Sequence, residues 1–103
     1  MWRQGDIFFE QVKEVPELAS QAKIEHGIIA HGEVTGHQHR LEDLSTAALF
    51  FYYNKAGEFF LKVTAPQARI VHEEHGPIHL PIGSYRVWRQ REYSPEAIRY
   101  VYD

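Results

Sequence analysis

Turn-forming residues interrupt this chain about every ten residues, and this spacing limits the apolar segments between them to the length of β-strands. A fold of strands alternating with longer helices would need longer uninterrupted segments. Aromatic residues make up 14% of the chain, which is also typical of strands. The sequence therefore predicts an all-β fold.

About seven or eight short strands are expected, with at most two helical turns. The main predicted strands cover residues 7–12, 24–33, 47–53, 58–63, 68–72 and 84–91. Turns or breaks are expected at residues 5–6, 54–57, 65–66, 76–77 and 83. A single helical turn is expected within residues 15–22, and Ser94 followed by Pro95 predicts a short C-terminal helix or arm. A small barrel or a compact sandwich would protect the edges of so short a sheet.

Length and composition limit the class of protein. The chain has 103 residues, of which 44% are hydrophobic and 24% charged, so a single globular domain spanning residues 1–103 is expected rather than a disordered, collagenous or coiled-coil chain. The net charge of −3 does not favour a dedicated nucleic-acid-binding protein, which usually carries a basic excess.

The chain contains no cysteine, which excludes disulfides, thiolate metal sites and a cysteine nucleophile. The first residues show no signal-peptide pattern, and the longest apolar run, residues 47–53, is too short to span a membrane. We therefore expect a cytoplasmic protein without a membrane partner.

Seven histidines stand out in this composition, and four of them form two closely spaced pairs. His37 and His39 are two residues apart, so on an extended chain both imidazoles point to the same side. His72 and His75 form the second pair, and the turn after His75 can bring its ring back towards the same site. These four residues are the predicted ligands of one divalent metal ion, for which Zn, Fe, Mn and Ni are the candidates.

Several carboxylates lie near the two pairs. Glu74 is two residues from His72 and is the candidate catalytic residue, as a general base or as a further ligand. Glu42 and Asp43 follow His39 closely enough for a loop to return one of them to the metal, so either could complete the site instead. The remaining histidines, His26, His31 and His79, are expected on the surface.

The segment from Gly32 to His39, with its His-x-His pair, resembles the first metal motif of the cupin superfamily, and Pro81-Ile82-Gly83 resembles the turn of the second. The resemblance implies a cupin-like barrel with a single metal ion, without implying a particular reaction. Cupins place a glutamate where this chain has Asp43, and their last histidine follows the turn instead of preceding it. The segment from His72 to Tyr93 is also similar to small uncharacterised phage and bacterial proteins.

Three functions are compatible with these features. The first is a metal-binding protein, either a metal-dependent hydrolase or oxygenase or a protein with a structural metal, so that enzymatic activity stays open. The second is a metal-independent ribonuclease with histidines as acid and base, and Arg40, Arg86, Arg89 or Arg91 beside the phosphate.

The third function is binding of single-stranded nucleic acid by the aromatic and basic residues of one segment, which are Arg86, Trp88, Arg89, Arg91 and Tyr93. The partners expected from these alternatives are a small molecule, a phosphodiester or a nucleic acid. The exposed aromatic residues are also compatible with a homo-oligomer.

Overall fold

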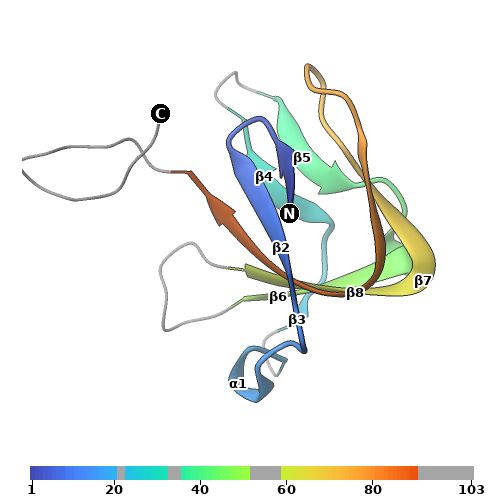
Figure 1. Ribbon diagram of the computed structural model, residues 1–103. Coiled ribbons are helices and arrows are strands. Elements are labelled where there is room, and N and C mark those ends of the chain that lie inside the picture. Colours follow the sequence, from blue (N-terminus) through green and yellow to red (C-terminus); the bar gives the residue numbers. More distant parts are fainter. Residues whose placement is uncertain (21–22, 33–35, 52–58, 91–103) are drawn as a thin grey trace, which may run out of the picture.

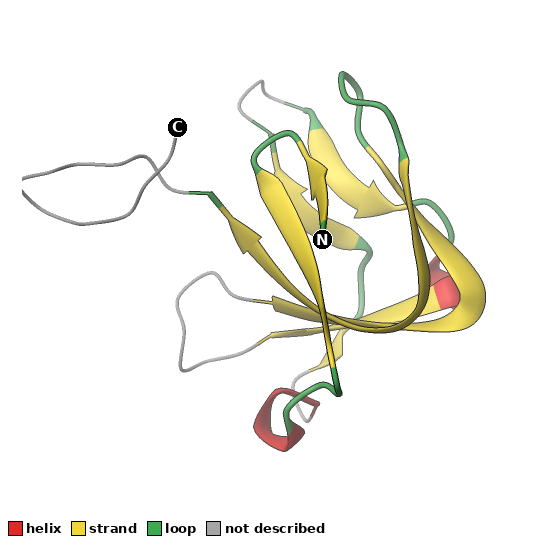
Figure 2. Cartoon of the chain, in the orientation of Figure 1, coloured by secondary structure: helices red, strands yellow, loops and turns green. Residues whose placement is uncertain are grey.

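The computed structural model describes residues 1–20, 23–32, 36–51 and 59–90. Within them the chain forms eight strands, which are β1 (Trp2–Gln4), β2 (Ile7–Val12), β3 (Lys23–Ile24), β4 (Ile28–His31), β5 (Gln38–Leu41), β6 (Ala47–Phe51), β7 (Phe59–Val71) and β8 (Ile78–Arg89). The helical elements are α1 (Glu17–Ser20) and the 3-10 helix η1 (Leu44–Thr46). The predicted all-β fold of about eight strands is confirmed (Figure 2). No helix in the described parts is long and apolar enough to cross a membrane.

All eight strands belong to one antiparallel sheet (Figure 1). The hydrogen-bonded order is β1-β2-β8-β7-β5-β4, and β6 pairs both with β7 and with β3. Among the described residues the sheet is open, because β1 and β4 end this order without pairing with each other. The expectation of an all-β domain therefore holds, whereas a closed barrel is not what the strand order gives.

The sheet bends in the middle of its two longest strands, β7 and β8. One half of β7 pairs with β6, from Phe59 to Val63, and the other half pairs with β5 at Ile70 and Val71. Val63 pairs with Gly83 and Gln67 with Pro81, so three residues of β7 lie opposite a single residue of β8 and the ladder carries a bulge at the bend. The two halves of the sheet fold towards each other around this bend.

Two predicted strand ends were wrong because both positions lie at the bulge inside a longer strand. Residues 65–66 were expected to separate two strands and Gly83 to make a turn, but they lie inside β7 and β8. Pro66 has no N–H to give to the ladder, and Gly83 has a φ of 147°, so both occur at the bulge instead of ending a strand. The cupin-like segment Pro81-Ile82-Gly83 is accordingly part of a strand.

Other boundaries follow the sequence more closely. The expected strand at residues 24–33 is divided into β3 and β4, and β1 was not predicted. The expected hairpin of residues 47–53 and 58–63 is confirmed by pairing from Ala47 with Val63 to Phe51 with Phe59. Its turn at residues 54–57 and the expected C-terminal helix lie outside the described residues.

The core lies between the two halves of the bent sheet. Its buried side chains alternate along the strands, as in β2, where Ile7 and Phe9 are buried and Phe8 is not. Tyr85 and Val87 are buried on β8 as the period-two pattern predicts. Together these apolar side chains form one cluster, which packs the strands of the two halves against each other.

Candidate functional site

Three connections meet at one end of the molecule, at the top of Figure 1. They are the β1–β2 turn, the ends of β4 and β5, and the six-residue loop between β7 and β8. Together they surround a cavity of about 350 Å³. Its lining residues are Arg3, Gly5, Asp6, Gly32, His37, His39, His72, Glu74 and His75.

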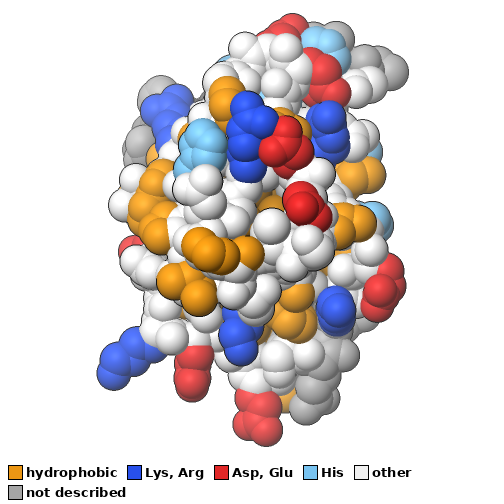
Figure 3. All heavy atoms as spheres, turned by 90° about the vertical axis from the view of Figure 1, so that its right-hand side faces the viewer, with side chains coloured by type: hydrophobic (Ala, Val, Ile, Leu, Met, Phe, Trp, Pro, Cys, Tyr) orange, Lys and Arg blue, Asp and Glu red, His pale blue; other side chains and the backbone are white. Residues whose placement is uncertain are grey.

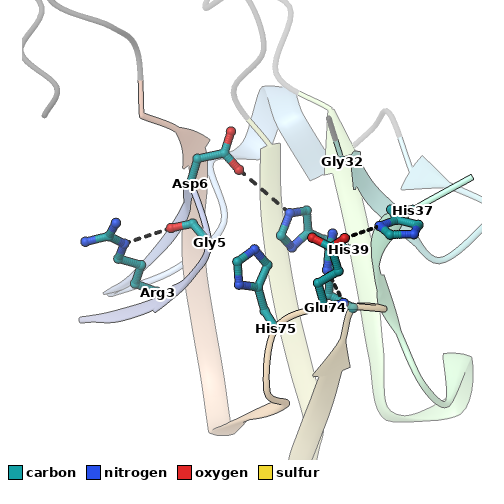
Figure 4. Close-up of a pocket in the computed structure, with 9 residues that line it drawn as sticks. Arg3, Gly5, Asp6, Gly32, His37, His39, Glu74 and His75 are labelled. Carbon is teal, nitrogen blue, oxygen red and sulfur yellow. Dashed lines mark hydrogen bonds and ion pairs between the residues drawn. The ribbon is translucent and has the colours of Figure 1, made fainter. Parts of the chain in front are cut away.

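All four predicted metal-ligating histidines and the predicted catalytic Glu74 line this cavity (Figure 4). The His39 ring centroid is 4.2 Å from that of His72 and 6.1 Å from that of His75. His72 is 4.7 Å from His75 and 5.8 Å from His37, again between ring centroids. The tertiary structure thus brings together two pairs that are more than thirty residues apart in the chain.

His39 is the buried member of the cluster, with an exposed fraction of 1%. Its Nδ1 lies 2.9 Å from Oε1 of Gln4, and Nε2 of Gln4 donates to the carbonyl oxygens of Ile70 and Gly76 at 3.0 and 2.9 Å. Because the Gln4 amide uses its hydrogens on these carbonyls, its oxygen must accept from His39. The proton of the neutral His39 ring is therefore on Nδ1, and Nε2 carries a free lone pair.

Burial and the neighbouring His72 are the two largest causes that lower the pKa of His39 to about 4. Burial also lowers the pKa of His72, and the nearby His75 adds to this effect. Both rings are therefore neutral at pH 7, which is the form in which imidazole binds a metal.

His72 has the opposite tautomer to His39. The backbone N–H of Glu74 donates to Nδ1 of His72 at 3.0 Å, so in the neutral ring the proton is on Nε2. That Nε2 faces Gly32, where a Cβ atom would lie only 2.9 Å away. A side chain at position 32 would therefore displace His72.

His37 and Glu74 lie next to each other in the lining of the cavity. The His37 Nδ1 is 3.4 Å from Oε2 of Glu74, and this nitrogen is buried without a hydrogen bond among the described residues. Glu74 itself is 56% exposed, so it lies at the cavity mouth. One nitrogen each of His37 and His72 and one oxygen of Glu73 also lie within 4.8 Å of one another.

The alternative carboxylates lie elsewhere. Glu42 pairs with Arg69, and Asp43 accepts hydrogen bonds from the backbone and hydroxyl of Ser45 at the start of η1. These hydrogen bonds to Ser45 lower the pKa of Asp43. Neither residue lines the cavity, so among the predicted carboxylates only Glu74 reaches it.

The histidines expected on the surface are found there. His26, His31 and His79 are exposed and do not line the cavity. His31 does contribute its backbone carbonyl, which accepts a hydrogen bond from Nη2 of Arg89.

Residues 3–6 are the part of the site that sequence reasoning missed. Residues 5–6 were recognised only as a turn, yet Asp6 places its Oδ1 3.7 Å from Nε2 of His39. Arg89 donates to the other oxygen of Asp6 at 2.7 Å. The available signal was a two-residue Gly-Asp hairpin, which delivers a carboxylate to the end of a sheet.

The described residues proposed for nucleic-acid binding make contacts within the protein. The Trp88 ring stacks on Phe8 at 5.5 Å between centroids, and the Arg86 guanidinium lies over the Trp88 ring, 4.2 Å from its centroid. Arg89 holds Asp6, whereas Arg91 and Tyr93 lie outside the described residues. On the face seen in Figure 3, acidic and basic side chains are interspersed, without a continuous basic stripe.

Fold and site together define a small antiparallel β protein with a histidine-rich pocket at one end of its sheet. A family model described as a domain of unknown function, DUF8820, matches residues 3–90, and the chain belongs to this family. The match includes every residue that lines the pocket. No curated protein and no solved structure matches the chain.

Proposed function

We propose that this protein binds one divalent transition-metal ion, either Zn, Fe, Mn or Ni, through His37, His39, His72 and His75. The observation that carries the proposal is the gathering of these four imidazoles around one cavity. Imidazole is a ligand that all four metals accept. The cupin resemblance of the segment ending in His37 and His39 is compatible with such a site and stays a prediction.

The ring spacing supports a shared ion. A metal bound at about 2.1 Å from nitrogen lies roughly 3.2 Å from the ring centroid, so neighbouring rings around one ion have centroids about 4.5–5.2 Å apart. The separations between His39, His72 and His75 are 4.2, 4.7 and 6.1 Å, which bracket this range. Binding one ion through all three rings requires side-chain rotations that bring their nitrogens to a common point.

His39 needs the least change, because its neutral ring already has a free Nε2. Its contact with Gln4 resembles the outer hydrogen bond that metal-bound histidines usually make through their second nitrogen. His72 would ligate through Nδ1 only after giving up its bond from the Glu74 backbone. The ring of His39 is thus held in place, whereas ligation by His72 requires the loop that carries His72 and His75 to rearrange.

When bound, an ion of this class supplies Lewis acidity for hydrolysis or, for iron, redox capacity for oxygenation. Glu74 lies at the mouth of the cavity beside His37, where its carboxylate can take a proton from a water or a substrate. A metal-dependent hydrolase is therefore the activity to assay first, with small esters and phosphodiesters as substrates.

The test is elemental analysis of the purified, untagged protein beside two double variants. His37→Ala/His39→Ala removes two pocket histidines, and His26→Ala/His79→Ala removes two exposed histidines outside the pocket. We expect a near-stoichiometric metal in the wild type and the control variant and none in the pocket variant. Equal metal contents in both double variants, or no metal uptake by the wild type from any of the four ions, would refute the proposal.

One observation favours a second function, acid–base cleavage of a phosphodiester without a metal. His39 offers a bare Nε2 and His72 offers an Nε2–H, which are the two states that a base and an acid need. Two arginines could act on a bound phosphate: Arg3 lines the cavity, and the charge of Arg89 acts on His39. Ribonuclease activity that persists in excess EDTA and is lost in both His39→Gln and His72→Gln would support this function over the metal site.

A further inference from the structure

The histidine pocket contains a ring nitrogen and a carboxylate oxygen that face each other at a distance too long for a hydrogen bond. Gln4 fixes the proton of neutral His39 on Nδ1, so the Nε2 that points to Asp6 carries only a lone pair. The Asp6 Oδ1, 3.7 Å away, is a carboxylate oxygen and likewise has no hydrogen to give. A cation between these two atoms would be attracted by both of them.

The Asp6 carboxylate is also fixed in this orientation. Its Oδ2 accepts from Nη1 of Arg89 at 2.7 Å, and its backbone carbonyl accepts from the N–H of Gln90 at 2.8 Å. The guanidinium of Arg89 is itself held by the carbonyl of His31. The β1–β2 turn is thus tied to β8, which keeps Oδ1 directed at His39 (Figure 4).

We infer that Asp6 is a ligand of the metal ion, and that the ion binds between Oδ1 of Asp6 and Nε2 of His39. The inference rests on the proposed metal-binding function and names a ligand that the histidine pairs do not supply. Two ligand atoms bound to one ion at about 2.1 Å lie roughly 3.0–4.2 Å apart, depending on the angle between them. The observed 3.7 Å falls inside this range without any movement of the chain.

The other carboxylates near the cavity, among the residues that the structure describes, are less suited to this role. Glu73 accepts a hydrogen bond from the backbone of Gln38 through Oε1, and its Oε2 lies 3.6 Å from Nη1 of Arg40. Glu74 faces His37 at the exposed mouth of the cavity. Asp6 is the pocket carboxylate that faces the buried, correctly protonated histidine, so it supplies the negative charge at the inner end of the site.

The first experiment compares Asp6→Asn with Glu42→Gln by calorimetric titration of metal-free protein with Zn²⁺. Both substitutions neutralise a carboxylate paired with an arginine, but only Asp6 lines the cavity. We expect the wild type and Glu42→Gln to bind with equal affinity and Asp6→Asn to bind at least tenfold more weakly. Unchanged affinity in Asp6→Asn would overturn the inference while leaving the metal-binding function intact.

The second experiment uses the wild type alone, so it decides the matter even if Asp6→Asn does not fold. Nuclear magnetic resonance of the histidine ring nitrogens and the aspartate carboxyl carbons follows the same Zn²⁺ titration. We expect Nε2 of His39 and the carboxyl carbon of Asp6 to shift together, while Nδ1 keeps its proton. Zinc binding that leaves the Asp6 carboxyl resonance unchanged would overturn the inference, and a wild type that binds no ion would refute the proposed function itself.

Discussion

Gln4 is a buried amide whose oxygen and nitrogen are both hydrogen-bonded, and it decides which ring nitrogen of His39 carries the proton. It links the backbone of Ile70 and Gly76 to the ring of His39. Loss of any one of these hydrogen bonds would leave a buried polar group without a partner. Such groups cost about 1–3 kcal/mol each when left unpaired. The neutral form and the tautomer of His39 are therefore properties of its surroundings.

Acid is expected to destabilise the metal-free protein through His39. Its pKa is about 4 in the folded chain and 6.5 as a free side chain, so between these values the unfolded chain binds the additional proton. The stability associated with neutral His39 is thus fully present above pH 6.5 and decreases as the pH falls towards 4, by about 3 kcal/mol in total.

Urea unfolding at a series of pH values in EDTA measures this effect. A His39→Gln variant, which cannot titrate, should show a much weaker dependence over the same interval. Parallel curves for the wild type and His39→Gln would show that other groups cause the acid sensitivity.

The β1–β2 hairpin joins fold and site through its two-residue turn. Gln4 pairs with Ile7 across Gly5 and Asp6, so the same turn that reverses the chain also delivers Asp6 to the cavity. Gly5 has a φ of 60°, and a Cβ atom there would lie 2.7 Å from Nε2 of His75. Glycine is required at this position both by the backbone and by the histidine packed on it.

Gly5→Ala is therefore expected to destabilise the protein by about 1 kcal/mol or more and to weaken metal binding by displacing His75. Gly76→Ala is the matched control in the β7–β8 loop, since a Cβ atom at Gly76 would meet nothing within 4 Å. Thermal unfolding and zinc titration of both variants check the prediction. Gly5→Ala with wild-type stability and affinity would contradict it.

The bent sheet as a whole holds the three connections of the site together, and an ion bound there would cross-link them. Binding only to the folded state stabilises it by about 2.7 kcal/mol at a ligand concentration one hundred times the Kd. For a domain of this length, that corresponds to a rise in Tm on the order of 10 °C.

Differential scanning calorimetry with Zn²⁺ and then with excess EDTA measures this shift. The rise should be reversed by EDTA and should be absent from His37→Ala/His39→Ala. A Tm that does not respond to any of the four candidate ions in the wild type would contradict a structural contribution of the metal.

Sequence patterns predicted the structural features that depend on residues close to one another in the chain. The alternation of Tyr85 and Val87 on β8 identified a core face, and the two-residue spacing of His37 and His39 placed both rings on the same cavity. The curl of the chain after His72 also brought His75 to the cavity, as the following turn suggested. Turn-forming residues predicted strand ends less reliably in β7 and β8, because Pro66 and Gly83 lie at a bulge where both strands continue.

The sequence by itself determined the all-β class, the core-facing side of β8 and the two histidine pairs, since each follows from the side-chain periodicity of a strand or from the spacing of turns. Only the tertiary structure decided that Gln4 and Asp6 belong to the same site, that Glu42 and Asp43 do not, and that the sheet stays open. Those outcomes depend on the bend of β7 and β8 and on contacts such as that of Gln4 with His39, 35 residues apart, for which short-range patterns carry no information.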